Sequence, residues 1–242
     1  MSFETTKTVR ELAVEIPNAA RVFEKLKIDY CCGGGKSLEE ACTAAGLGVA
    51  EVARLLEESK GIEVTGPDNP AAGSLTELVQ FILAKHHVYT KDEMERLKPL
   101  LQKVCDAHGR NHPELFKVRG IFAQLCDDLT PHMFKEEQIL FPYIMRVEEA
   151  TKGNRSLTPP PFGTVRNPVR MMQAEHETAG DFLRLLRKLT NDYTAPADAC
   201  ISYQTLYHAL EEFERDLHQH IHLENNILFP RAVELETSSY VV

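Results

Sequence analysis

Apolar residues recur at intervals of three and four along most of the chain, which is the pattern of amphipathic helices. Beyond residue 74 the pattern runs long enough to predict four long helices, over about 75–104, 113–149, 168–191 and 196–235. No segment alternates convincingly between apolar and polar positions, as a strand would. The sequence therefore predicts an all-α protein with a four-helix bundle, in which the prolines inside the second helix cause local kinks or breaks.

The first 60 residues show shorter helical periods, broken by glycines. Three consecutive glycines place Asp29–Lys36 in a turn, after which Ser37 is a helix N-cap and Gly46 ends that helix. We expect a small N-terminal helical domain over 1–62 and a linker over 63–73. A bundle domain over 74–242 then begins with the capping-box pattern of Ser74 and Glu77.

Composition narrows the function classes. The formal net charge is −9 and no Lys- or Arg-rich patch stands out, which disfavours a nucleic-acid binder. No apolar run approaches the roughly 18 residues that a membrane helix needs, and the N-terminus lacks the order of a signal peptide. The six cysteines do not have disulfide spacing. We therefore expect a cytoplasmic protein with reduced thiols, no membrane partner and no nucleic-acid partner.

An internal repeat carries the candidate chemistry. The segment from His132 to Pro142, HMFKEEQILFP, returns 88 residues later as HIHLENNILFP. Each copy holds a Glu four residues after its first His, which gives the pairs His132/Glu136 and His220/Glu224. On a helix this spacing places His and Glu on one face, here the apolar face, where an unpaired carboxylate would be costly. A bound cation resolves that cost.

The repeat extends to one more His in each half. His87 precedes His132 by 45 residues, and His176 precedes His220 by 44. Four imidazoles and two carboxylates exceed the needs of one tetrahedral zinc, and a nitrogen and oxygen set without thiolate suits iron. A single His is more often a hydrogen-bonded core or surface residue, but the duplicated pattern favours metal. We predict two iron ions, each with two terminal imidazoles, bridged by Glu136 and Glu224 and by an oxo group.

Other titratable residues near the repeat are separated from this set. Glu137 is excluded because Asn225 takes its place in the second copy, and His218 and His222 are assigned to a solvated face. His86 competes with His87, and the spacing favours His87 only slightly. Glu175, beside His176, is a candidate for holding a ligand or relaying a proton.

Cys31 and Cys32 form the other unusual feature. Adjacent thiols in a turn before a helix can bind metal, exchange electrons or react with oxidants, and such a position can lower a thiol pKa. The alternative is that small residues simply pack a tight turn. The end of the turn, Gly34-Gly35-Lys36-Ser37, is similar to a phosphate-binding loop, but the leading Gly and the preceding strand are missing.

Taken together, these motifs resemble the bacterial di-iron proteins for the repair of iron centres, also called iron–sulfur cluster repair proteins. The resemblance covers essentially the whole chain. It is carried by Asp29-Tyr-Cys-Cys-Gly-Gly, by Glu175-His176 and by the two repeat segments. It implies a hemerythrin-like bundle behind a Cys-Cys domain, and an iron-ligand role for His87, His132, Glu136, His176, His220 and Glu224. The family's turn has one Gly fewer than Gly33–Gly35, and oxygen-carrying hemerythrins use more His, which disfavours oxygen transport.

The resemblance further implies a stress protein that restores iron–sulfur clusters damaged by nitric oxide or oxidants, by donating iron or binding nitric oxide. Damaged iron–sulfur proteins, nitric oxide or oxygen, and a second copy of the chain are the candidate partners. Two alternatives stay open. One is an enzyme that reduces nitric oxide at the iron pair, and the other is a hemerythrin-like module that senses oxygen or nitric oxide.

Overall fold

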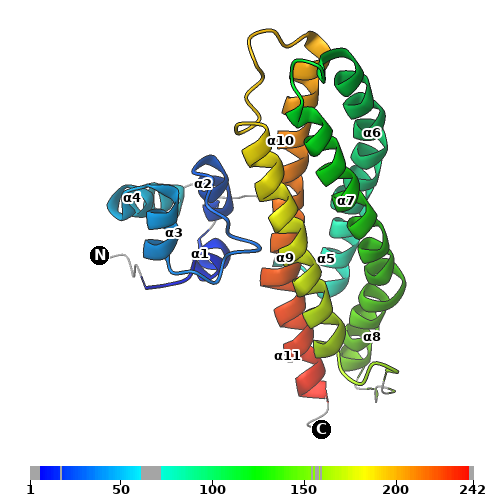
Figure 1. Cartoon of the computed structure of the whole chain (residues 1–242). Helices are drawn as coiled ribbons and strands as arrows, with labels where there is room; N and C mark the ends of the chain where they lie inside the picture. Colours follow the sequence, from blue (N-terminus) through cyan, green and yellow to red (C-terminus); the bar gives the residue numbers. More distant parts are fainter. Residues whose placement is uncertain are drawn as a thin grey trace. The chain divides into compact units, whose positions relative to one another are not determined.

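The computed structural model describes residues 6–16, 18–60, 72–153, 155, 158 and 160–239. Over these residues the regular structure is helical, apart from an isolated bridge between Thr8 and Ser37, and the predicted all-α class is confirmed (Figure 1). Most of the predicted linker, 63–71, lies outside the described residues. The division into domains at 62 and 74 stays a prediction.

Short helices come first in the chain and long ones follow. The short helices are α1 (Val9–Glu15), α2 (Ala19–Lys25), α3 (Leu38–Ala45) and α4 (Val49–Lys60). Three of the long runs contain a π-helical segment, η2, η3 or η4. In order they are α5 (Leu75–Phe81), η2 (Ile82–His87) and α6 (Val88–His108); α7 (Glu114–Lys135), η3 (Glu136–Leu140) and α8 (Phe141–Lys152); α9 (Arg166–Leu189); and α10 (Ile201–His222), η4 (Leu223–Leu228) and α11 (Phe229–Ser239).

Capping residues set several of these bounds. The Ser37 hydroxyl accepts from the Glu40 N–H while the Glu40 carboxylate accepts from the Ser37 N–H, which satisfies two donors at the start of α3. Gly46 ends that helix with φ of 68°, a conformation that suits glycine. The same reciprocal bonds join Ser74 and Glu77 before α5. The predicted caps are therefore confirmed.

Contacts among the described residues divide the chain into two compact units, with boundaries inside α5, α8 and α10. One unit comprises residues 1–79, 147–157 and 218–242. Its short helices enclose a core that includes Val9, Leu12, Phe23, Tyr30, Leu38 and Leu56. In the other unit, 80–146 and 158–217, α7 packs against α6 and α9. Fully buried side chains there include Leu97, Phe122, Leu125 and Phe213.

Prolines lie inside the long helices, as expected, but the helices stay continuous. Pro131 lies within α7, whose helix runs on to Lys135. Pro142 lies two residues beyond the end of the π-helical segment η3, and Pro230 lies two residues beyond the end of η4. A π turn widens the helix and shifts its hydrogen-bond pattern, which accommodates a nearby residue that lacks an N–H. The expected break in the second long helix is the π-helical segment η3, which lies between Pro131 and Pro142.

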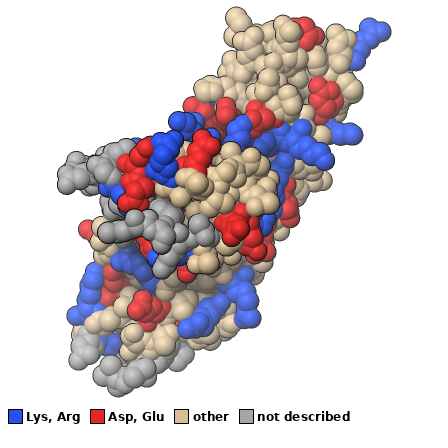
Figure 2. All heavy atoms as spheres, turned by 90° about the vertical axis from the view of Figure 1, so that its left-hand side faces the viewer, with Lys and Arg blue, Asp and Glu red and all other residues tan. Residues whose placement is uncertain are grey.

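The face in Figure 2 carries acidic and basic side chains intermixed, without a large area of one sign. This agrees with the absence of basic clusters in the sequence. Among the described residues, no helix combines the length and the apolar character that crossing a membrane requires.

Candidate metal centre

Four of the predicted ligands lie on helices that pack together. His87 ends η2, His132 lies in the last turn of α7, and Glu136 opens η3. His176 comes from the middle of α9. The exposed fraction of each of these side chains is at most 2%. Polar groups at this depth need partners, and these side chains turn their polar atoms towards one another.

The ring nitrogens and carboxylate oxygens of these four side chains converge. Glu136 Oε2 lies 3.4 Å from His87 Nε2, and Glu136 Oε1 lies 3.4 Å from His132 Nε2. His132 Nε2 and His176 Nε2 face each other at 3.0 Å. Two imidazoles that point the same edge at one spot, beside a carboxylate, have the orientation of ligands to a shared ion.

The second copy of the repeat gives a matching pair. His220, in the last turn of α10, places Nε2 2.9 Å from Oε1 of Glu224, which lies in η4. Both side chains are buried. Each copy thus brings its His and its Glu together, as the spacing predicts.

The six predicted ligands fall into two groups that could each hold a cation. Their ligand atoms lie within 4.8 Å of one another in each group, and every residue is buried. Glu136 and Glu224 belong to both groups, which is the arrangement expected of bridging carboxylates. The groups are His87, Glu136, His220 and Glu224, and His132, Glu136, His176 and Glu224.

The groups of candidate ligands include His87 and not His86. His86 directs Nδ1 to the Asp216 carboxylate at 3.1 Å and packs edge-on against Phe81. The two residues are neighbours in a π-helical segment and both are buried. Spacing alone could not separate them, whereas the direction of each ring does.

In two of the candidate ligand imidazoles a carboxylate contacts Nδ1, the ring nitrogen that faces away from the candidate ion site. Glu175 Oε2 lies 2.7 Å from His132 Nδ1, and Glu175 also pairs with Lys135. The hydrogen bond from His132 outweighs the opposing effect of burial and, with Lys135, lowers the pKa of Glu175 to about 2. A carboxylate in this position fixes the ring orientation and leaves Nε2 to face the ion. This contact is the one expected of Glu175 if it holds a ligand.

Glu137 has the corresponding contact on His87, with Oε1 2.8 Å from Nδ1, and pairs with Lys91. Burial opposes its ionisation, but the hydrogen bonds from Lys91 and His87 hold its pKa below the ordinary value. Glu137 is absent from both ligand groups, as the comparison of the two repeats predicts. It nevertheless contacts a predicted ligand, His87. Comparison of the repeats gave no sign of this contact, because the copies differ at this position.

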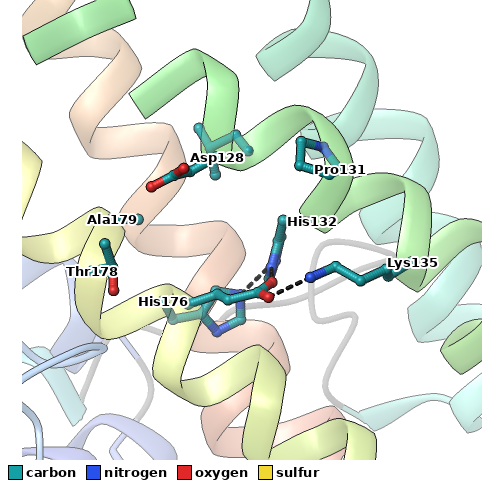
Figure 3. Close-up of a pocket in the computed structure, with 9 residues that line it drawn as sticks. Asp128, Pro131, His132, Lys135, His176, Thr178 and Ala179 are labelled. Atoms are coloured by element: carbon teal, nitrogen blue, oxygen red, sulfur yellow. Dashed lines mark hydrogen bonds and ion pairs between the residues drawn. The ribbon is translucent and has the colours of Figure 1, made fainter. Parts of the chain in front are cut away.

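A pocket of about 200 Å³ reaches the imidazoles of His132 and His176. Figure 3 shows both rings at its wall between α7 and α9, with Lys135 at the edge. Asp128, Glu175 and Thr178 also line it. A small ligand or an ion can therefore approach this pair of imidazoles.

The cysteine turn is closed by Asp29, whose Oδ1 accepts from the N–H groups of Cys31 at 3.2 Å and Cys32 at 2.9 Å. The two Sγ atoms lie 3.6 Å apart, and with Asp29 they form a third group able to hold a cation. A Cβ on Gly34 would lie 2.5 Å from the Tyr30 carbonyl oxygen, so the turn excludes a side chain there. Burial and the hydrogen bond with Cys32 raise the pKa of Cys31. The expectation of a lowered thiol pKa is wrong for this residue.

The same turn contacts the second repeat segment. Asn226 Nδ2 donates to the Tyr30 carbonyl at 3.0 Å and lies 2.8 Å from His222 Nδ1. The rings of Tyr30 and His222 meet edge-on with centroids 5.2 Å apart. His222 is buried, so its assignment to a solvated face is wrong. The position of His222 on its helix predicted a solvated face. That prediction failed because Tyr30, which covers His222, comes from a turn about 190 residues earlier in the chain.

Long helices that bury two groups of His and Glu define a helical protein built to bind a pair of cations. Residues 78–232 match the family model described as Hemerythrin HHE cation binding domain, and residues 5–60 match a domain of unknown function, DUF542. The chain belongs to the family of iron–sulfur cluster repair proteins, because relatives of that name are about 35% identical to it over nearly its whole length.

Three relatives illustrate the match. The probable iron–sulfur cluster repair protein of Haemophilus influenzae is 36% identical over 96% of this chain and 99% of its own length. The iron–sulfur cluster repair protein YtfE of Musicola paradisiaca is 35% identical over 95% and 97%. That of Yersinia pseudotuberculosis is 35% identical over 93% and 96%. The hemerythrin-like bundle that the motifs implied is confirmed.

Proposed function

We propose that this protein restores damaged iron–sulfur clusters in the cytoplasm, with an iron pair held by its six buried His and Glu residues. The observation that carries the proposal is the pair of buried ligand groups sharing Glu136 and Glu224. Its relatives' names supply the process, and damaged iron–sulfur proteins are the clients that this process requires.

The donor set fits iron. His87 and His220 would hold one ion, His132 and His176 the other, and Glu136 and Glu224 would bridge them. Imidazole and carboxylate without thiolate suit iron, and two imidazoles with two carboxylate oxygens leave positions for solvent, an oxo bridge or a small ligand. When bound, the pair supplies exchangeable iron and positions that can take nitric oxide.

The surrounding residues do the positioning. Glu137 and Glu175 keep His87 and His132 oriented through Nδ1, and the lysines beside them neutralise their charge. The pocket at His132 and His176 supports a route by which iron leaves or a small ligand enters. Glu175 lies on that route, which suits it to relay a proton as well.

Cys31 and Cys32 are proposed to take part as a thiol pair. A separation of 3.6 Å between the Sγ atoms suits two thiolates on one tetrahedral ion, for which bond lengths of about 2.3 Å give roughly 3.7 Å. Burial raises the pKa of Cys31, so an ion bound by the pair would have to replace thiol protons at neutral pH. The pair could also supply electrons to the cluster.

The test is reactivation of a cluster enzyme that nitric oxide has inactivated. The iron-loaded chain is expected to restore activity in proportion to the iron it delivers. Glu136→Ala should restore little because it loses a shared ligand. Cys31→Ser with Cys32→Ser should keep its iron but deliver it more slowly. Glu95→Gln, on an exposed side chain, is the matched control. No reactivation by the iron-loaded chain would refute iron donation.

Access through the pocket also favours nitric oxide reduction as a second function. Donation consumes the bound iron once, whereas an enzyme turns over. Anaerobic nitrous oxide formation beyond the amount of protein would support the reductase, and formation below one equivalent would exclude it.

A further inference from the structure

Another cluster of side chains of the types that bind metals lies where the turn after α6 meets the loop before α10. His108 ends α6 and His112 lies in the turn before α7, while Asp198 and Cys200 precede α10. In sequence they form two short pairs, His108-x-x-x-His112 and Asp198-x-Cys200. His108 is 21 residues beyond His87, about 30 Å along the helix, so this cluster is separate from the iron ligands.

The four side chains form two close pairs across the two segments. His108 Nε2 lies 3.1 Å from Cys200 Sγ. His112 Nε2 lies 3.0 and 3.1 Å from the two carboxylate oxygens of Asp198. Each imidazole thus directs Nε2 towards a side chain that can ligate a metal.

Neighbouring groups hold both imidazoles in this orientation. Glu114 Oε1 lies 3.1 Å from His112 Nδ1, the contact that carboxylates make with metal-binding histidines. The Tyr203 ring packs against both imidazoles, with centroids 5.3 Å from His108 and 5.6 Å from His112. Tyr203 is fully buried, so it gives the two rings a firm support.

Two imidazoles, a carboxylate and a thiolate are the donors of a tetrahedral zinc site, whereas Ca²⁺ and Mg²⁺ take oxygen. The imidazole centroids lie 6.4 Å apart. On one tetrahedral ion they would be about 5 Å apart, so the pairs must approach by about 1 Å. His112 is only partly buried and lies in the turn before α7, so its ring can make this movement, and the exposed Asp198 and Cys200 can follow it.

We propose that His108, His112, Asp198 and Cys200 bind one divalent cation of the zinc class. The ion replaces the thiol proton of Cys200, which is released to solvent, and any proton shared between His112 and Asp198. It thereby joins the α6–α7 turn to the loop before α10. The site is independent of the iron pair and of the proposed repair function.

Cobalt(II) titration of the iron-loaded full chain tests this site, because a cobalt–thiolate bond gives its own charge-transfer absorption. The protein carries Cys31→Ser and Cys32→Ser, so that this adjacent thiol pair cannot bind cobalt. One Co²⁺ per chain is expected to bind with thiolate absorption, and Zn²⁺ should displace it. Cys200→Ser should abolish the absorption, and His112→Gln should weaken binding at least tenfold. His208→Gln, on an exposed residue of α10, should change nothing.

A second measurement is the rate at which iodoacetamide alkylates Cys200, followed by mass spectrometry of the peptides. Zn²⁺ should slow this rate at least tenfold, and His112→Gln should remove the protection. Cobalt–thiolate absorption that survives Cys200→Ser would overturn the proposal. Equal Co²⁺ affinity in all the variants, which indicates surface binding only, would also overturn it, as would alkylation that Zn²⁺ does not slow.

Discussion

Two imidazoles of the candidate metal centre are held by the same three-residue arrangement. In one, Lys91 pairs with Glu137, which contacts His87 Nδ1; in the other, Lys135 pairs with Glu175, which contacts His132 Nδ1. The lysines lie at the surface end and the imidazoles are buried. Each carboxylate is therefore kept ionised beside a ring that must present Nε2 to an ion.

Removing either carboxylate charge should loosen iron. Glu137→Gln and Glu175→Gln are each expected to raise the rate of iron loss to a chelator by about 10–100-fold, because the imidazole loses its fixed orientation. The rate is measured from the absorbance of the iron–chelator complex. Glu95→Gln serves as the control, and iron loss at the wild-type rate in both variants would show that these contacts are incidental.

Single residues also mark the limit of prediction from the sequence. The duplicated spacing selects six residues, and the structure brings all six into two groups. The contact of Glu137 with His87 and the burial of His222 beside Tyr30 could not be predicted, because these partners come from distant segments. Such partners leave no periodic signal. His86 and His87 could be told apart only by the directions of their rings.

At the scale of elements, long helices and caps follow from periodicity and from Ser, Glu and Gly at their ends. The π-helical segments do not. They carry His87, Glu136 and Glu224, and π turns are frequent at functional sites. Local helix propensity does not predict a π turn, because a π turn is less stable than an α turn by itself and is stabilised by the tertiary contacts of the residues that it reorients. The sequence signalled only that prolines follow two of them.

The start of α5 depends on a carboxylate from another helix. Glu148, in α8, accepts from the N–H groups of Leu75 and Thr76 at 2.9 and 3.0 Å and from the Thr76 hydroxyl at 2.6 Å. Burial opposes its ionisation, but these hydrogen bonds hold its pKa below the ordinary 4.5. The charge thus stabilises the fold above that value.

Glu148→Gln should lower the free energy of unfolding by about 0.5–2 kcal/mol near neutral pH, the usual range for a lost helix cap. Because the folded-state pKa is lowered, this contribution is lost as the pH falls below 4.5 and through the folded value. Urea unfolding of both proteins at neutral and acidic pH measures it. A difference that stays constant with pH would show that ionisation of Glu148 does not stabilise the helix.

At the scale of the whole molecule, the duplicated repeat explains why residues from both copies are needed to complete each group of candidate ligands. Each copy supplies a His and Glu pair, and each ligand group draws on both copies. Four imidazoles and two carboxylates are buried together, at a cost that a bound pair of cations would offset. We therefore expect metal binding and folding to be coupled.

Bound iron at a free concentration a hundredfold above its dissociation constant stabilises the folded state by about 2.7 kcal/mol. Chelating the iron should therefore lower the midpoint of thermal unfolding by roughly 5–10 °C. Calorimetry with and without chelator gives the shift. His220→Ala should melt earlier and respond much less to chelator. Equal melting of the iron-loaded and the chelated wild type would contradict this coupling.

The central claim is that six residues hold two irons bridged by Glu136 and Glu224. Metal analysis combined with Mössbauer spectroscopy of the wild type and Glu136→Ala tests it most directly. We predict two irons per wild-type chain with a magnetically coupled spectrum, and loss of iron or of the coupling in the variant. A single zinc per chain, or two irons that stay coupled without Glu136, would contradict it.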